Sequence, residues 1–402
     1  TRVRSSAASD VYKRQVVDKV RVLIVDDSAI MRKIIASALQ KEPSIEIAGF
    51  AANGLQAIEA IQTCNPDVMT LDIEMPEMDG LTALREIRKV NKYLPIIMFS
   101  SLTHKGAQAA IMALTAGASD YVGKPANTTG GIDNAFRVLE AELIPKIIGL
   151  AKRVKSRRDR EGQLASTPKS SPSPTAKIVP TAKSLVSTKD APSLASKMSK
   201  ATSGILAKPA EAVCIGVSTG GPEALMQVFS AFNAPINVPI FIVQHMPADF
   251  TALLAARLSA TGVMTVKEAE EGEIAEPGIA YIAPGGFHMT LTRPGTKTII
   301  HLNTEPPENS CRPAVDVLFR TAAEVYGNSL LAVMLTGMGY DGLKGTQVIK
   351  EKGGQVIAQD EATSVIWGMP GAVVQAGLAD SVMPIDKITD EIIFRTRKVP
   401  GR

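Results

Sequence analysis

A serine on a glycine-lined turn is the first feature of this chain that could do chemistry. The apolar run that begins at Ala212 leads into GVSTGG, where Ser218 lies between Gly216 and Gly220. This G-x-S-x-G spacing is typical of a sharp strand-to-helix turn that exposes a serine hydroxyl above a parallel sheet. Backbone N–H groups at the start of the next helix can stabilise an oxyanion. The turn could therefore hold a nucleophile, cradle a phosphate or be merely structural.

The glycine spacing disfavours a phosphate site. A dinucleotide-binding turn needs the pattern G-x-G-x-x-G, and a P-loop needs Gly-Lys followed by Ser or Thr. Gly216, Gly220 and Gly221 fit neither pattern. We therefore favour a nucleophile, although a structural glycine-rich turn would show the same residues.

A serine nucleophile needs a base and an acid that orients the base. His245 closes the strand-like run PIFIVQ, which places it at the same predicted sheet edge as Ser218. Asp341 and Asp360 both follow strand-like runs, and their spacing does not choose between them. The other histidines lie in the first domain or near later strand-like runs, where packed or solvated roles are expected: His104, His288 and His301.

A second group of charged residues belongs to the N-terminal part of the chain. Asp26 and Asp27 end one strand-like run, Asp72 ends another and Lys124 follows a third. The carboxyl ends of parallel strands meet at one sheet edge, so these side chains should gather there. Three carboxylates repel one another unless a cation such as Mg²⁺ lies among them, and an aspartate can be phosphorylated while a lysine neutralises the added charge. Each acid taken alone could instead cap a helix.

The elements that must position these residues alternate between strand-like and helix-like runs, which predicts parallel sheets with helices on both faces. We predict one α/β domain over residues 19–150 and another over 210–396. Residues 151–209 are rich in Ser, Thr, Pro, Lys and Ala without an apolar period, which indicates a flexible linker. Residues 1–18 are predicted to be a disordered extension.

The composition narrows the class of protein. A formal net charge of +4 and 4% aromatic residues give no support for nucleic-acid binding. The three cysteines are far apart in the sequence, which fits a reducing cytosol. No apolar run has the length of a membrane span. We expect a cytoplasmic protein that binds no nucleic acid and does not insert into a membrane.

The N-terminal domain resembles the receiver domain of two-component response regulators. The resemblance rests on VLIVDDSAIMR, LDIEMPEMDG, MFSSLT and GASDYVGKP. It implies a flavodoxin-like fold in which Asp72 accepts a phosphoryl group. The remaining implied roles are Mg²⁺ binding by Asp26, Asp27, Asp72 and the carbonyl of Glu74, switching by Ser100 and Tyr121, and phosphate contact by Lys124.

The C-terminal domain resembles the catalytic domain of chemotaxis protein-glutamate methylesterases. The motifs are IGVSTGGPEAL, IVQHMPADFTALLAARL, IAPGGFHM, RPAVDVLF, LTGMGYDG and VIAQDEATSVIWGMPGAV. The resemblance implies a Rossmann-like doubly wound sheet with Ser218 as nucleophile, His245 as base and Asp341 as orienting acid. It also implies oxyanion donors in the backbone near Thr219 and Met338. Phe287 stands where the family commonly has a basic residue, and the linker is unusually long.

Together these resemblances imply a phosphorylation-regulated enzyme of chemotaxis adaptation. It would hydrolyse glutamyl methyl esters on chemoreceptors and deamidate glutamines there, with a histidine kinase as phosphodonor and no cofactor for the esterase chemistry. The receiver is expected to lie over the strand-end face of the esterase domain. Two alternatives are an esterase for another protein and a non-catalytic regulator.

Overall fold

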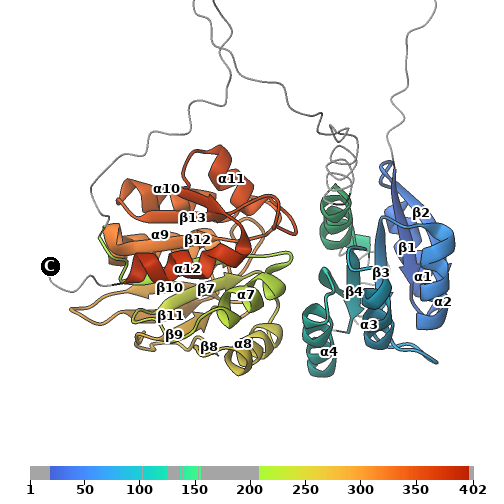
Figure 1. Cartoon of the computed structure of the whole chain (residues 1–402), viewed down its shortest axis with the longest axis horizontal. Helices are drawn as coiled ribbons and strands as arrows, with labels where there is room; N and C mark the ends of the chain where they lie inside the picture. The colour runs from blue at the N-terminus through green and yellow to red at the C-terminus, as the bar shows by residue number, and fades with distance from the viewer. Residues whose placement is uncertain are drawn as a thin grey trace, which may run out of the picture.

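The computed structural model describes residues 19–101, 103–124, 136–137, 139–152, 154 and 208–397. These residues form two α/β domains, one blue to green and the other yellow-green to red in Figure 1. The predicted extension lies outside the described residues, and so does most of the predicted linker.

The N-terminal domain is a five-stranded parallel sheet in the order β2-β1-β3-β4-β5. Its strands are β1 (Val20–Val25), β2 (Ile45–Ala51), β3 (Val68–Asp72), β4 (Ile96–Ser100) and β5 (Asp120–Gly123). Its helices with described ends are α1 (Ala29–Leu39), α2 (Gly54–Cys64), α3 (Gly80–Val90) and α4 (His104–Thr115).

Each of these four helices begins after a residue whose side chain accepts a hydrogen bond from a backbone N–H of the first turn: Ser28, Asn53, Asp79 and Thr103. Such caps satisfy N–H groups that have no partner within the helix. A further helix is described at residues 136–137, then from the π-helical turn Leu139–Leu143 to residue 152, and again at 154. It therefore passes the boundary predicted at residue 150.

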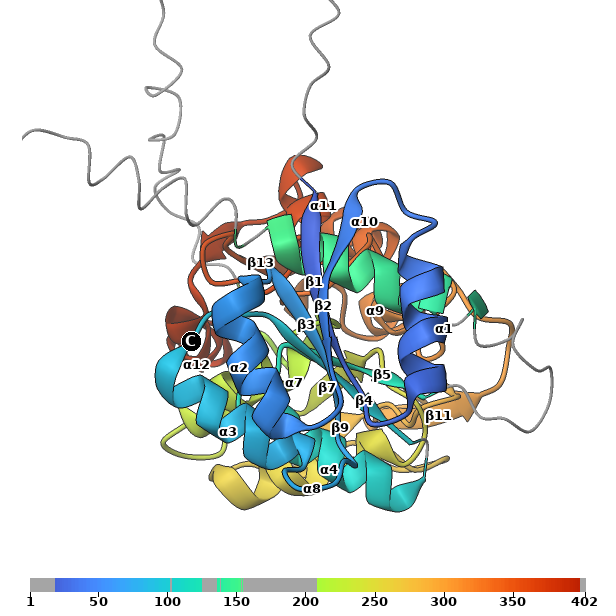
Figure 2. The ribbon, with the colours of Figure 1, turned by 90° about the vertical axis from the view of Figure 1, so that its right-hand side faces the viewer.

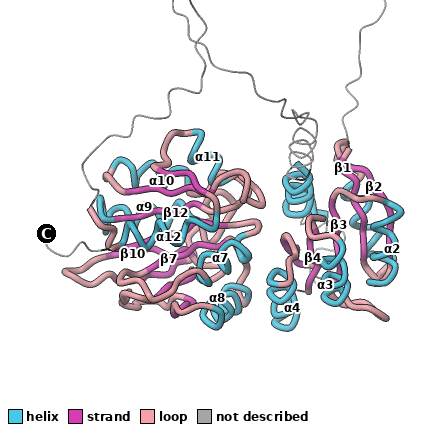
Figure 3. The backbone as a smooth tube through the Cα atoms, in the orientation of Figure 1, coloured by secondary structure: helices cyan, strands magenta, loops and turns pink. Residues whose placement is uncertain are grey.

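The C-terminal domain is a seven-stranded parallel sheet in the order β14-β13-β12-β6-β7-β9-β8. Its strands are β6 (Ala212–Val217), β7 (Ile240–Gln244), β8 (Thr265–Glu268), β9 (Ile279–Ile282), β12 (Leu330–Met334), β13 (Gln355–Gln359) and β14 (Ser381–Met383). Its α-helices are α7 (Gly221–Ser230), α8 (Phe250–Thr261), α9 (Val315–Tyr326), α10 (Leu343–Glu351), α11 (Met369–Gln375) and α12 (Ile385–Thr396). Figure 3 shows the strands of each domain enclosed by helices, which confirms the predicted architecture.

Several elements of the second domain were not predicted, among them helices α11 and α12. The edge strands β8 and β14 are short and partly exposed, so they lack the apolar runs that identify the central strands. An antiparallel hairpin, β10 (His288–Thr292) with β11 (Ile299–Asn303), forms a separate two-stranded sheet.

The two domains pack against each other, with the N-terminal domain in front in Figure 2. Helix α4 contacts α7 and α8. The ring of Tyr121 stacks on that of Phe250 at the start of α8, with centroids 4.6 Å apart and planes 14° apart. Both rings belong to one buried apolar cluster, which also contains Met246. The interface is therefore continuous with the two cores.

The helix over residues 139–152 makes a second contact with the other domain. A Cβ atom at Gly149 would lie 2.7 Å from Cδ1 of Ile366. Val365 packs into the same apolar cluster as Leu139, Leu143 and Ile147. Glycine at position 149 lets the helix approach Ile366, whereas a larger residue would require the end of the Ile366 side chain to move.

Candidate active site

The central strand β6 and its two neighbours position the predicted triad. Val217 pairs with Gln244 in the register of β6 and β7, so Ser218 and His245 occupy the next positions of adjacent strands. Strand β12 pairs with the other side of β6, and Asp341 lies on the loop that follows β12. The strands that directly follow β6 in the chain lie on one side of it, and the strands from β12 onward lie on the other. In open α/β sheets, ligand sites form at the point where the strand order switches in this way.

Glycines shape the turn that carries Ser218. Gly220 has a φ of +75°, a left-handed conformation that favours glycine, and a Cβ atom there would lie 2.4 Å from Val365. A Cβ atom at Gly337 would lie 2.9 Å from the Cβ atom of Ser218. The loop after β12 therefore packs directly on the serine turn.

The serine turn opens helix α7 without a side-chain cap. Among the described residues, neither the Thr219 N–H nor the Met338 N–H donates a hydrogen bond to another residue. The Thr219 carbonyl accepts a bond of 3.0 Å from the Thr336 hydroxyl. The two backbone N–H groups predicted to stabilise the oxyanion are thus available to donate hydrogen bonds to a ligand.

His245 and Asp341 form a hydrogen-bonded pair, with Nε2 of the ring 2.7 Å from Oδ2 of the carboxylate. A carboxylate only accepts, so Nε2 carries the proton and Nδ1 is left to act on a substrate or nucleophile. Burial lowers the pKa of His245, but the bond to Asp341 and then the contact with Cys311 raise it to about 9. Burial raises the pKa of Asp341, yet His245 and backbone donors bring it below its ordinary value.

Cys311 is an unpredicted neighbour of the imidazole. Its Sγ atom lies 3.6 Å from Nδ1 of His245. In the described part of the chain no hydrogen bond joins Ser218 Oγ to the imidazole. The sequence drew attention to Cys311 only as one of three isolated cysteines, although it immediately precedes the RPAVDVLF motif.

The other candidates lie apart from this pair. Asp360 accepts hydrogen bonds from Thr363. His288 is buried and contacts the Pro306 carbonyl and the Ala314 N–H. His301 contacts Thr292 and Glu271, while His104 begins α4 in the other domain. The geometry thus distinguishes Asp341 from Asp360, which spacing could not do.

The three acidic residues predicted to gather in the N-terminal domain do lie close together. Oxygen atoms of Asp26, Asp27 and Asp72 all lie within 4.8 Å of one another. Lys124 Nζ is 2.6 Å from Asp72 Oδ2 and 3.5 Å from Asp26 Oδ2. Burial raises the pKa of Asp72 to about 6 despite Lys124. Asp26 Oδ2 is buried without a hydrogen-bond partner, which fits a site for a hard cation.

The remaining predicted residues lie around this group. The Glu74 N–H donates to Asp72 Oδ1 at 3.3 Å. The Ser100 hydroxyl donates to the Gly106 carbonyl of α4 at 2.7 Å. Tyr121 is buried against Phe250 at the domain interface. Of the two predicted switch residues, Ser100 therefore contacts α4 and Tyr121 contacts the other domain.

The fold and these two sites define a hydrolase-type α/β domain attached to a receiver. Residues 213–392 match the CheB methylesterase family and residues 22–134 match the response regulator receiver domain family. The chain is 47% identical over 377 residues to the protein-glutamate methylesterase/protein-glutamine glutaminase of Trichodesmium erythraeum (strain IMS101), covering 94% of this chain and 99% of that protein. The enzyme of the same name from Pyrococcus abyssi (strain GE5 / Orsay) is 41% identical, with 95% of both chains covered.

A solved structure of the Thermotoga maritima CheB methylesterase catalytic domain is 46% identical and covers 46% of this chain and 98% of that chain, with a TM-score of 0.45. The chain belongs to the family of protein-glutamate methylesterases/protein-glutamine glutaminases that carry an N-terminal receiver domain. It is thus a response-regulator hydrolase of chemotaxis. Among the described residues, no helix is long and apolar enough to cross a membrane.

Proposed function

We propose that Ser218, His245 and Asp341 carry out the esterase reaction. The Ser218 hydroxyl attacks the ester carbonyl while His245 Nδ1 takes its proton, and Asp341 stabilises the imidazolium that results. The Thr219 and Met338 N–H groups face the oxyanion. The imidazolium returns the proton to the leaving methoxy group, which departs as methanol. Water then cleaves the acyl-enzyme to glutamate by the same proton transfers, and a glutamine substrate releases ammonia instead.

The observation that carries this proposal is the bonded His245–Asp341 pair at the strand position beside Ser218. Productive attack needs Ser218 Oγ within hydrogen-bond reach of Nδ1, a contact that often tightens only when substrate binds. The Ser218 hydroxyl must therefore replace the Cys311 thiol as the group that contacts Nδ1 of His245.

Cys311 is the competing nucleophile, because its thiol is the group that contacts Nδ1. Ser218 differs from Cys311 in its position before a helix whose first N–H groups have no side-chain cap. The first N–H groups of the nearby helix α9, from Val315 and Asp316, already donate to Asp341. Ser218 instead lies just before α7, whose N-terminus has no side-chain cap.

Methanol release from methylated receptor distinguishes the two nucleophiles. Ser218→Ala should abolish turnover and labelling by a serine-directed fluorophosphonate, whereas Cys311→Ala should retain both. The reverse pattern would assign the reaction to the thiol. A wild-type protein that neither releases methanol nor is labelled would favour the non-catalytic regulator.

The receiver's residues fit the regulatory chemistry. Asp72 is the proposed phosphoacceptor, and Asp26, Asp27, Asp72 and the Glu74 carbonyl would hold Mg²⁺. The ion would neutralise the clustered carboxylates and the incoming phosphoryl oxygens. The Lys124 ammonium forms an ion pair with Asp72. After phosphorylation it would contact the oxygens of the phosphoryl group. A chemotaxis histidine kinase is the proposed phosphodonor, and the substrates are proposed to be cytoplasmic segments of chemoreceptors.

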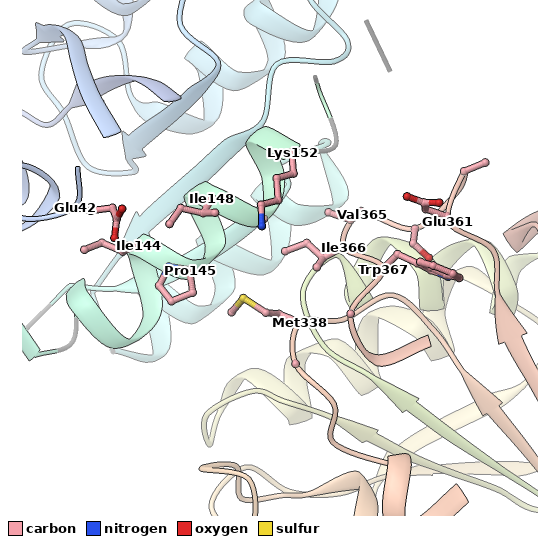
Figure 4. Close-up of a pocket in the computed structure, with 15 residues that line it drawn as sticks. Glu42, Ile144, Pro145, Ile148, Lys152, Met338, Glu361, Val365, Ile366 and Trp367 are labelled. Carbon is pink, nitrogen blue, oxygen red and sulfur yellow. The ribbon is translucent and has the colours of Figure 1, made fainter. Parts of the chain in front are cut away.

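The domain contact supports inhibition by the unphosphorylated receiver. A cleft of about 780 Å³ separates residues 144–152 of the receiver from the loop of Met338 and from Ile366 and Trp367. Figure 4 shows Pro145 and Lys152 on one side of the cleft and Met338 and Ile366 on the other. Met338 is also a proposed oxyanion donor, so the receiver borders the approach to the site. Phosphorylation would move Ser100 and Tyr121 and loosen the contact.

The test compares the full chain without phosphodonor with a fragment that lacks residues 1–205. The fragment should release methanol faster. Equal rates would rule out inhibition by the receiver, and a slower fragment would make the receiver an activator.

A further inference from the structure

Asn309 lies in an unusual turn next to the proposed catalytic pair. Glu308 and Cys311 exchange two backbone hydrogen bonds, of 3.1 and 2.9 Å, across the two residues between them. Those two residues have positive φ angles, 52° at Asn309 and 64° at Ser310. Asparagine tolerates this left-handed conformation better than most residues. The turn places Asn309 over the start of α9 and Cys311 on His245.

The Asn309 amide joins two buried carboxylates. Its Nδ2 atom lies 2.8 Å from Asp341 Oδ1 and 2.9 Å from Asp316 Oδ2. Asp341 is 3% exposed and Asp316 is fully buried. The other carboxylate oxygen of Asp341 accepts a hydrogen bond from His245, and that of Asp316 accepts one from the Gly345 N–H. One neutral side chain therefore lies between two carboxylates that water does not reach.

The chemistry of this position suits an amide better than other side chains of its size. An NH₂ group has two hydrogens in one plane and can donate one to each carboxylate. An aspartate would place a third carboxylate against the first two. An apolar residue would leave one oxygen of each carboxylate with fewer donors, and buried groups without partners are costly.

The turn is itself anchored from outside the site. Arg320 of α9 forms two bonds with Glu308, Nη1 to Oε1 at 2.8 Å and Nη2 to Oε2 at 2.6 Å. This paired geometry restrains both the position and the orientation of the Glu308 carboxylate. Asn309 is therefore presented to the two aspartates by a turn that is fixed to the same helix as Asp316.

We propose that Asn309 is a positioning residue for the esterase reaction, because it holds the Asp341 carboxylate in the orientation that accepts from His245. This inference rests on the proposed function, in which Asp341 orients the base. The three backbone donors to Asp341 come from Val315, Asp316 and Gly342. Asn309 supplies the side-chain donor that ties the carboxylate to Asp316 as well.

The test is a double-mutant cycle on the full chain with phosphodonor, with methanol release as the assay. Asn309→Gly keeps the left-handed backbone and removes the amide. It should lower kcat by about 10- to 100-fold, the range for loss of a hydrogen bond to a charged group, with little change in KM. Ser310→Gly is the matched control, because Ser310 is exposed and has the same backbone conformation in the same turn.

The second background is Asp341→Asn, measured with and without Asn309→Gly. If Asn309 acts through Asp341, its loss should cost less than about twofold there. The same fold-loss in both backgrounds would assign Asn309 a structural role and overturn the proposal, as would wild-type kcat in Asn309→Gly.

Asn309→Asp provides a second readout if the glycine variant unfolds. It keeps the shape of the side chain and should lower kcat by at least about 10-fold relative to the wild type, because the new carboxylate repels Asp341. Wild-type kcat would overturn the proposal. Ser218→Ala in parallel separates the two hypotheses: an active Ser218→Ala protein contradicts the proposed function, whereas an inactive one beside an unaffected Asn309→Gly contradicts only this inference.

Discussion

The stacked pair Tyr121 and Phe250 allows a quantitative test of control by the receiver. Tyr121 lies on β5 of the receiver, and Phe250 begins α8 of the esterase domain five positions after His245. Tyr121 is 7% exposed and Phe250 is 2% exposed, so the stack is buried. Lys146 Nζ lies 2.7 Å from the Tyr121 carbonyl and 5.4 Å from the ring centroid, which fixes the tyrosine from its own domain.

The perturbation is Tyr121→Ala. A buried aromatic pair contributes about 0.5–1.5 kcal/mol beyond the area that it buries. Since about 1.4 kcal/mol corresponds to a factor of ten in an equilibrium constant, loss of the stack should shift the equilibrium from the closed toward the open arrangement by about 2- to 12-fold. The lost apolar contact adds to this, so the range is a lower bound. If little of the protein is open at rest, the unphosphorylated rate should rise by the same factor.

The assay is methanol release from methylated receptor by the full chain without phosphodonor. Phe50→Ala is the control, because Phe50 is 54% exposed on the receiver's edge strand β2. The increase should persist in Tyr121→Ala combined with Asp72→Asn, since it does not require phosphorylation. A basal rate equal to that of the wild type in a folded Tyr121→Ala protein would refute the reasoning.

Three further predictions concern the two sites. The pKa of His245 is raised to about 9, and a general base must be unprotonated, so kcat/KM should increase with pH up to about 9. Cys311→Ala removes a contact that raises this pKa, so in a pH–rate profile it should move the increase to lower pH. Asp341→Asn should retain the fold by circular dichroism and reduce kcat by about 10⁴-fold, as expected when a histidine loses its orienting carboxylate, whereas Asp360→Asn should have little effect, and the opposite ranking would transfer the role. The pKa of Asp72 is raised to about 6, so phosphorylation by a small acyl phosphate should fall as the pH drops through that value, and phosphoprotein measured from pH 5 to 8 with no such decrease would contradict an ionised Asp72 as the acceptor.

Sequence reasoning predicted the parts of this molecule that depend on apolar runs and on residues at strand ends. The central strands are buried and rich in apolar residues, so their runs identified them, and the parallel arrangement then brought Ser218 and His245 to one edge. Strand β8 carries TVKE, a short and partly exposed segment that shows no apolar run.

The contacts within the site could not be predicted from spacing. Asp341 and Asp360 both follow strands, and only the path of each loop decides which of them reaches His245. Cys311 and Asn309 belong to a turn whose conformation depends on two left-handed residues and on the Glu308–Arg320 pair. Such a turn has no periodic pattern, so its neighbours are known only once α9 has been placed.

The place of β6 at the centre of the sheet has a consequence for how activity arises as the chain is made. This strand is the first of its domain to leave the ribosome, yet it lies between β7 and β12, and β12 is synthesised much later. The serine turn can close beside His245 as soon as β6 and β7 pair. Asp341, and the loop that packs on Ser218, arrive only when β12 docks on the other side. A nascent or truncated domain that ends before β12 therefore has Ser218 and His245 without Asp341, and under the proposed mechanism hydrolysis should begin only after β12 and its loop have docked.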